Sequence, residues 1–162
     1  MNLTSSEIAS LWTAYMNDIM AKCILSYMLK HIQDSEVQPV IQLGLIIASN
    51  HLEQLSGIFE YENFAIPNGF TESDVNLNAP SLFTDAFYLT YLNHMSKFGL
   101  LAYSGFIVLS AREDMRNYFI QCLTETSTLF NQSSEVLINK GLFVRSPYIM
   151  VPSKIDYIDT KK

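Results

Sequence analysis

The chain has 162 residues, of which 16% are charged and 49% hydrophobic, and its net charge at pH 7 is −6. This length fits one domain whose core needs no disulfide or metal, and the acidic balance without a Lys/Arg cluster excludes a nucleic-acid-binding surface. The small share of polar residues indicates that some apolar surface meets a partner. Cys23 and Cys122 both fall in helical patterns and are expected to be free thiols in a reducing compartment.

No targeting or membrane signal is apparent in the sequence. Residues 1–7 carry no basic stretch ahead of an apolar core, so we expect no signal peptide and synthesis in the cytosol. The longest apolar run, residues 98–109, is about 12 residues long, which is too short to span a bilayer. We therefore expect a protein that does not enter the membrane.

The hydrophobic pattern has a helical period in four segments, each about 26 to 30 residues or about 40 Å long. The first and second segments are separated by about two residues, and the third and fourth by one or two, so each pair must form an antiparallel hairpin. The inward face of the third segment is expected to carry a stripe of large apolar residues (Phe83, Phe87, Tyr91, Phe98, Leu101 and Val108). The four helices are predicted at residues 5–33, 36–61, 80–109 and 111–140.

Sequence signals mark where these helices start and stop. The third helix is predicted to begin with Asn78 as its cap and Pro80 in its first turn, and Gly141 supplies the stop of the fourth. The other three starts fit the capping box, in which a hydroxyl and a carboxylate or amide satisfy free N–H groups reciprocally. These boxes are Thr4-x-x-Glu7, Ser35-x-x-Gln38 and Ser110-x-x-Glu113.

A long connection separates the two hairpins. Residues 62–77 contain Pro67 and Gly69, and when extended they could run the length of the bundle. One long crossover between two hairpins is the ferritin-like connectivity. The sequence therefore predicts an all-α, ferritin-like four-helix bundle that forms a single domain over residues 1–162.

The C-terminal tail, residues 142–162, reads as extended because Pro147 and Pro152 exclude a helix. Its many apolar side chains are unusual for a free end. We expect the tail to dock along its own bundle or to reach across to a neighbouring chain.

Each predicted helix has one ionisable residue near its midpoint: Asp18, His51, His94 and Glu125. Helix midpoints lie at one level of a bundle, so these side chains could converge in the interior. Two histidines and two carboxylates suit zinc or another divalent ion. However, Lys22 lies one turn after Asp18 and would neutralise it, and Glu125 lies at the edge of its apolar stripe. We expect a hydrogen-bonded polar layer with His51 facing His94, and a metal as the lesser alternative.

Sequence signals of catalysis are absent. None of the three histidines follows a Glu by three residues, which excludes the Glu-x-x-His ligands of ferritin-like di-iron sites. There is no Gly-x-Ser-x-Gly elbow and no Gly-rich phosphate loop. Neither cysteine has a histidine at a spacing that would indicate a catalytic pair. We expect a protein that is not an enzyme and that has no catalytic residue and no cofactor.

Three segments resemble a family of unknown function from endospore-forming bacteria, whose members are often labelled "putative spore coat proteins". The segments are residues 3–12 (Leu-Thr-Ser-Ser-Glu-Ile-Ala-Ser-Leu-Trp), residues 64–87 (Phe-Ala-Ile-Pro-Asn-Gly-Phe through Thr-Asp-Ala-Phe) and residues 110–114 (Ser-Ala-Arg-Glu-Asp). The resemblance implies a ferritin-like bundle and an association with the spore coat. It implies no catalytic set.

Two functions remain open at this point. The first is a non-enzymatic structural or assembly protein that forms a homodimer through the apolar faces of helices 5–33 and 80–109, through the tail, or both. Such a protein could also meet other spore proteins. The alternative is a bundle that binds a metal or a small apolar ligand, centred on His51 and His94.

Overall fold

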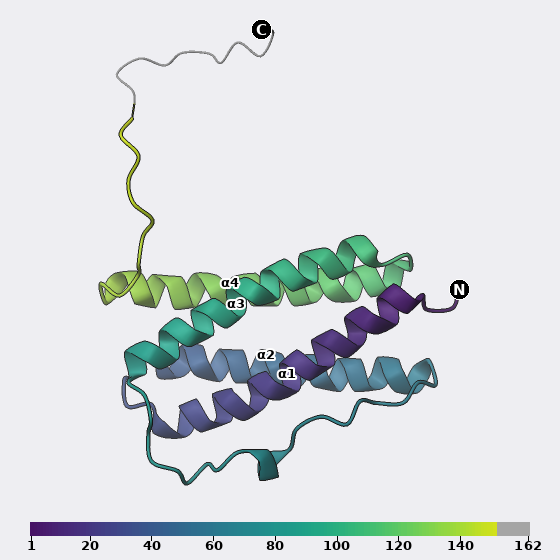
Figure 1. Ribbon diagram of the computed structural model, residues 1–162, viewed down its shortest axis with the longest axis horizontal. Helices are drawn as coiled ribbons and strands as arrows, with labels where there is room; N and C mark the ends of the chain where they lie inside the picture. Colours follow the sequence, from purple (N-terminus) through teal and green to yellow (C-terminus); the bar gives the residue numbers. More distant parts are fainter. Residues whose placement is uncertain (152–162) are drawn as a thin grey trace, which may run out of the picture.

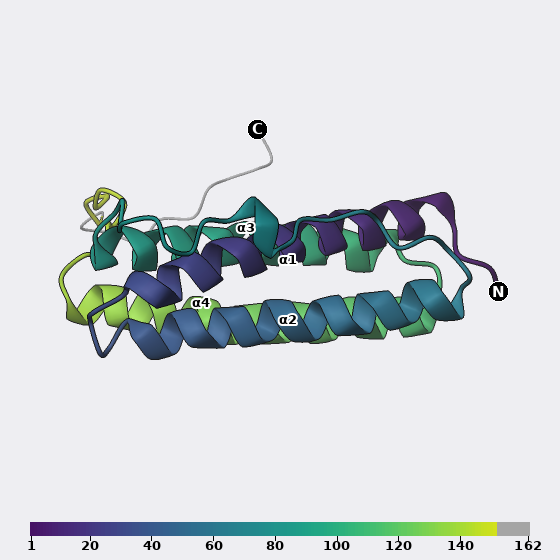
Figure 2. The ribbon, with the colours of Figure 1, turned by 90° about the horizontal axis from the view of Figure 1, so that it is seen from below.

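A computed structural model of the chain describes residues 1–151. The four long helices are arranged in two layers, with α1 and α3 in one layer and α2 and α4 in the other (Figure 1, Figure 2). No strand occurs in the described part of the chain, so the predicted all-α four-helix bundle is confirmed. The elements are α1 (Ser5–His31), α2 (Gln38–Tyr61), the short 3-10 helix η1 (Glu72–Asp74), α3 (Asp85–Leu109) and α4 (Glu113–Asn139).

The two hairpins are joined by the long crossover that the sequence predicted. Residues 62–84 run the length of the bundle beside α1 (Figure 1, Figure 2). The Tyr27 hydroxyl donates to the carbonyl of Pro80 at 2.6 Å, and Lys30 Nζ donates to Asn78 Oδ1 at 2.6 Å. Two antiparallel hairpins with one long crossover form the connectivity of ferritin-like bundles.

The sequence predicted the four helices correctly, but only some of their first residues agree with the structure. The capping box at Thr4 is present, with Glu7 N–H donating to the Thr4 hydroxyl and the Glu7 carboxylate accepting from Thr4 N–H. The box expected at Ser35 is wrong. Asp34 Oδ1 accepts from Glu36 N–H at 2.9 Å instead, and α2 begins three residues after Ser35 without a side-chain cap.

The start of the third helix and the third capping box were also wrong. The segment 78–80 belongs to the crossover, and α3 begins at Asp85, where the Thr84 hydroxyl accepts from Phe87 N–H at 3.2 Å. The Ser110 hydroxyl turns back and donates to the carbonyl of Phe106 at 2.8 Å, so it does not cap α4. A proline in the first turn is permissive for a helix but does not require one, and the Thr84 cap provides an equivalent start.

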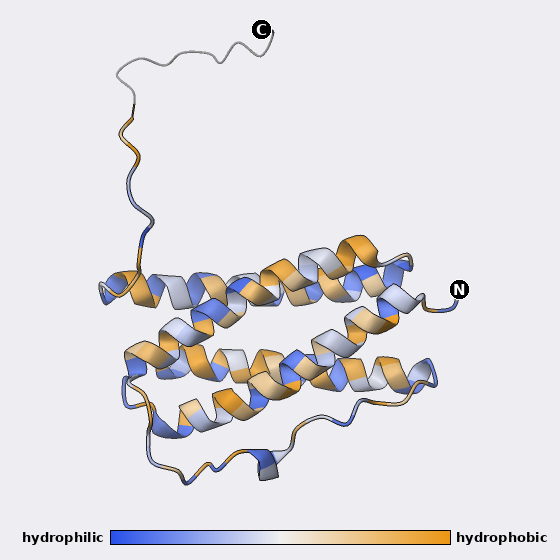
Figure 3. Cartoon of the chain, viewed as in Figure 1, coloured by the Kyte–Doolittle hydropathy of each residue, from blue (hydrophilic) through white to orange (hydrophobic). Residues whose placement is uncertain are grey.

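The face that α3 turns to the core differs from the prediction. The expected inward stripe is exposed, including Phe98 at 69%, Leu101 at 71% and Val108 at 85%. Hydrophobic residues accordingly lie on the outside of α3 towards its C-terminal end (Figure 3). The physical reason is that α3 is apolar nearly all round, so periodicity alone does not select a face. The residues buried instead are Tyr88, Leu89, Leu92, Asn93, Ser96 and Tyr103.

The tail leaves the bundle just after α4. Gly141 has a φ of +70°, which fits the predicted stop because only glycine adopts this conformation without strain. Phe143 still packs against the core, but residues 144–151 are exposed and extend away from the bundle (Figure 1). Residues 152–162 of the predicted tail lie outside the described residues. Within residues 1–151, no helix is long and apolar enough to cross a membrane.

Apolar side chains form two core clusters along the bundle. One contains Leu25, Ile41 and Leu89, and the other contains Leu11 and Phe119. On α1, α2 and α4, the residues of the two clusters are separated by about two turns. The core is therefore interrupted near its middle, at the level of the midpoint residues that the sequence singled out.

Glu7 joins the start of α1 to the turn before α4. Its side chain is fully buried, and its carboxylate accepts from Thr4 N–H at 2.7 Å, from the Thr4 hydroxyl at 2.8 Å and from Arg112 N–H at 2.8 Å. Burial acts to raise the pKa of Glu7, but the N–H donors of Arg112 and Thr4 outweigh it and hold the pKa below its usual range. One carboxylate thus caps α1 and ties the two hairpins together.

We expect Glu7→Gln to lower the free energy of unfolding by about 2 kcal/mol at neutral pH, because charge-assisted hydrogen bonds are lost. Since the folded-state pKa is lowered, this advantage of the wild type is full above the usual glutamate pKa and is lost as the pH falls through the folded-state value. Urea denaturation at several pH values measures it. Glu113→Gln, an exposed first-turn position of α4, is the control and should change little. An equal loss at neutral pH and pH 3 would contradict the prediction.

Candidate functional site

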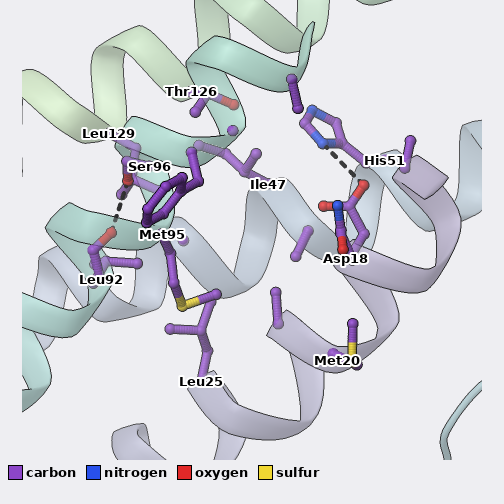
Figure 4. A pocket seen from close by; sticks show the side chains of 18 of the residues that line it. Asp18, Met20, Leu25, Ile47, His51, Leu92, Met95, Ser96, Thr126 and Leu129 are labelled. Atoms are coloured by element: carbon purple, nitrogen blue, oxygen red, sulfur yellow. Dashed lines mark hydrogen bonds and ion pairs between the residues drawn. The ribbon is translucent and has the colours of Figure 1, made fainter. Parts of the chain in front are cut away.

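His51, at the middle of α2, is the centre of a buried polar layer to which all four helices contribute. Its side chain is 1% exposed. Its Nε2 lies 2.8 Å from Glu125 Oε2 on α4, and its Nδ1 lies 3.5 Å from Asp18 Oδ2 on α1 and 3.3 Å from the Tyr103 hydroxyl on α3. Figure 4 shows His51 and Asp18 facing each other at one end of a pocket. This layer fills the gap between the two apolar clusters.

The charges in this layer stabilise one another. Burial acts to lower the pKa of His51, but the carboxylate of Asp18 and the nearby sulfur of Cys122 outweigh it and raise the pKa to about 10. Burial raises the pKa of Asp18, and its contact with His51 opposes that shift. As an imidazolium, His51 can donate one N–H to Glu125 and direct the other towards Asp18, so both ring nitrogens have partners.

Tyr103 completes the layer and was not anticipated from the sequence. Its hydroxyl lies 3.4 Å from Asp18 Oδ2, and its ring meets the His51 ring edge-on with centroids 5.8 Å apart. Burial and the nearby Asp18 raise the pKa of Tyr103, which keeps the phenol protonated as a donor. Ser96 lies seven residues earlier on the same buried face, so a polar stripe at heptad spacing was the signal that could have revealed Tyr103.

The structure brings together three of the four predicted midpoint residues. His94 is exposed, so the predicted interior pair of His51 and His94 is wrong. Its neighbour Asn93 is buried instead and donates to Ser133 and Ser134 of α4 at 3.0 and 2.9 Å. The error follows from the rotation of α3, because adjacent residues on a helix point about 100° apart.

The two features that weighed against the layer, Lys22 beside Asp18 and the edge position of Glu125, keep neither carboxylate away from His51. Lys22 is exposed and does not pair with Asp18, whose carboxylate turns inward to His51. Glu125 does lie at the edge of its stripe, with its side chain 33% exposed, and from there it accepts the shortest bond that His51 makes. The carboxylates of Asp18 and Glu125 contact opposite nitrogens of one imidazole ring, and within residues 1–151 no group of three His, Cys, Asp or Glu side chains has a metal-binding arrangement. The geometry is that of an ion-paired layer.

A cavity of about 330 Å³ opens beside this layer, between α1 and α3 (Figure 4). The two helices contact each other less than α2 contacts α4. Small residues between α1 and α3, among them Ala21, Gly99 and Ala102, leave the space for the cavity. One end of the cavity is polar and the remaining walls are mostly apolar. The polar end is formed by Asp18, His51 and Tyr103, and the lining also contains Asn17, Ser96 and Thr126. The apolar walls include Met20, Ile24, Tyr91, Met95, Phe98 and Phe106.

Comparison with known proteins places the fold but not an activity. A family model described as a protein of unknown function (DUF3231) matches residues 1–155. No curated protein sequence matches the chain. A crystal structure of a "putative spore coat protein" from Bacillus halodurans superposes with a TM-score of 0.83 at 18% identity, covering 93% of this chain and 98% of that one.

Two other solved structures share the arrangement of helices. A conserved hypothetical protein from Mycobacterium tuberculosis has a TM-score of 0.69 at 15% identity, covering 90% of this chain and 98% of its own. A DUF305 fragment from Deinococcus radiodurans has a TM-score of 0.71 at 10% identity, covering 86% of this chain and 99% of its own. At these identities the likeness establishes the fold alone.

We expect His51→Leu to lower the free energy of unfolding by about 3 kcal/mol at pH 7, because Asp18 loses its nearest cation inside the protein. The double variant Asp18→Asn/His51→Leu should recover part of that loss, since the uncompensated charge is gone. Denaturant unfolding with circular dichroism measures both. Glu53→Leu, at an exposed position of the same helix as His51, is the control and should change stability little.

The difference in unfolding free energy between the wild type and His51→Leu should also depend on pH. Because the folded-state pKa of His51 is raised to about 10, its stabilising effect is full below the pKa of an unfolded histidine and is lost as the pH rises through about 10. The difference in unfolding free energy between the wild type and His51→Leu should therefore shrink from pH 7 to pH 10. A difference that grows over this range would refute the cationic assignment.

Proposed function

The chain belongs to the DUF3231 family of proteins of unknown function, and we propose that it is a structural assembly protein that pairs with a second copy of itself through the outer face of α3. One observation carries this proposal: an exposed row of residues along α3 at coiled-coil spacing. We call this row the α3 seam. Its members are Phe87, Tyr91, His94, Phe98, Leu101, Gly105 and Val108.

The spacing of the α3 seam is that of a helix which packs against another helix. Its residues alternate at intervals of four and three along almost the whole of α3, the heptad pattern by which side chains of one helix insert between those of its partner. Phe98 and Leu101, near its middle, are among the most exposed large apolar residues of the bundle. Leaving this surface in water is costly, and burying apolar area favours association by roughly 25 cal/mol per Å².

Charge supports a second copy as the occupant. The seam contains no Asp, Glu, Lys or Arg, so two acidic chains can bring it together without opposing their carboxylates. A two-fold axis places the same surface on both sides of an interface, and a self-complementary apolar row meets that requirement. On α1, Met20 is also exposed and lines the same cavity as Phe98.

The comparisons support a structural role of this kind. The Bacillus halodurans protein of the same fold is described as a "putative spore coat protein". A coat is built from proteins that associate, and a bundle that presents an apolar helix face is suited to association. The exposed tail residues 144–151 offer a second apolar surface for neighbouring chains or other coat proteins. In this proposal the chain acts as a non-enzymatic component of the spore coat.

The test is the mass of the full chain in solution at micromolar concentrations, measured by sedimentation velocity. We expect a dimer for the wild type and a monomer for Leu101→Glu, because two carboxylates would face each other near the two-fold axis. Ile120→Glu, at an exposed apolar residue on α4 outside the seam, is the control and should remain dimeric. Circular dichroism should show the same helix content in all three.

Two outcomes would contradict this proposal. A monomeric wild type at 100 µM would remove self-association through the seam. A dimer that survives Leu101→Glu but dissociates when residues 144–162 are deleted would assign the interface to the tail instead.

A further inference from the structure

Asp18 is a buried carboxylate whose polar contacts within the protein are long. Its side chain is 11% exposed, and its two polar contacts, both through Oδ2, are 3.4 Å to the Tyr103 hydroxyl and 3.5 Å to His51 Nδ1. Charge-assisted hydrogen bonds are shorter, about 2.7–2.9 Å. His51 makes its short contact with Glu125 instead. No hydrogen bond to Asp18 Oδ1 is found within residues 1–151, although a buried carboxylate gains from each donor it can find.

The layer has an excess of negative charge, and Asp18 is its acidic member in the cavity lining. Asp18 and Glu125 contribute two negative charges, and His51 returns one positive charge. The residues that line the cavity include no Lys and no Arg, and Lys22, the nearest cation along α1, is exposed. Charge complementarity therefore favours a positively charged occupant next to Asp18.

The rest of the cavity is suited to a hydrocarbon group. Its volume of about 330 Å³ is roughly twice the 150 Å³ of an apolar cavity that accommodates benzene. The aromatic residues Tyr91, Phe98 and Phe106 line it, and aromatic rings attract ammonium groups. Met20 and Met95 are unbranched and can adapt to different shapes.

From these observations we propose that the cavity between α1 and α3 binds small organic amines, with the ammonium group at Asp18 and the hydrocarbon group among the apolar walls. An ammonium donates up to three hydrogen bonds and can satisfy the free oxygen of Asp18 while it neutralises the layer. A carboxylate ligand is repelled by Asp18 and Glu125. A neutral alcohol fills the same space but leaves the charge uncompensated.

The test compares three ligands of nearly the same shape on the full chain at pH 7: 2-phenylethylamine, 2-phenylethanol and 3-phenylpropionate. Isothermal titration calorimetry or ligand-observed NMR gives the affinities. We expect the amine to bind at least about tenfold more tightly than the alcohol, a difference of about 1.4 kcal/mol. The phenylpropionate should not bind detectably.

Variants separate charge recognition from filling of the cavity. Asp18→Asn should weaken binding of the amine about tenfold and leave binding of the alcohol nearly unchanged, because only the charge is removed. Ala102→Leu narrows the cavity and should weaken both ligands. Glu53→Gln removes an exposed carboxylate on the same helix as His51 and should change neither. Thermal melting of each variant establishes that it is folded under the binding conditions.

Several results would overturn this assignment. Equal affinities for amine and alcohol, or amine binding that is unchanged in Asp18→Asn, would mean that the carboxylate does not recognise the ligand. No saturable amine binding would mean that the cavity takes another occupant, such as a partner side chain or a metal ion. Binding should persist in Leu101→Glu, because this residue is not among those lining the cavity. Loss of amine binding in Leu101→Glu would mean that the site is not formed by one chain alone. This variant therefore tests amine binding separately from self-association.

Discussion

The structure depends on the ion-paired layer around His51. An imidazolium between Asp18 and Glu125 is expensive to remove from water, and this cost is recovered only when the partners approach in a favourable geometry. Since the partners come from α1, α2 and α4, the layer penalises arrangements in which one helix slides or turns relative to the others. The apolar clusters on either side supply most of the favourable burial, but leucine and phenylalanine contacts tolerate small shifts far better than a buried charge does.

The rotation of α3 links the layer to the surface of the protein. Because α3 directs Tyr103 into the layer and Asn93 towards α4, its Phe98 and Leu101 must face outward. The same rotation leaves few contacts between α1 and α3, and the cavity beside the polar layer lies between these two helices. The exposed seam and the cavity are thus two consequences of one packing choice. Tyr91 and Phe98 belong to both, so a ligand in the cavity and a second copy on the seam would contact the same two side chains.

The two proposals, self-assembly and amine binding, concern different parts of the protein. The α3 seam is a surface feature, and its proposed occupant is another chain of the same sequence. The cavity is an interior feature, and its proposed occupant is defined by the unmatched charge of Asp18. A structural coat protein that also binds a small amine would couple its packing to the composition of its surroundings. The fold is shared with a "putative spore coat protein" from Bacillus halodurans, so the two bundles can be compared at these two sites.

The sequence by itself determined the four helices, their pairing into hairpins, the long crossover and the first capping box, because these follow from periodicity, loop length and bonds between near neighbours. It also indicated Asp18, His51 and Glu125, since midpoints of equal helices share a level. Only the tertiary structure decided the face of α3, and with it the exposure of His94 and the role of Tyr103. The second half of α3 is apolar on nearly every side, so its hydrophobic pattern gives no preference for one face. That choice is made by packing against α4 and by the donors that the buried carboxylates require.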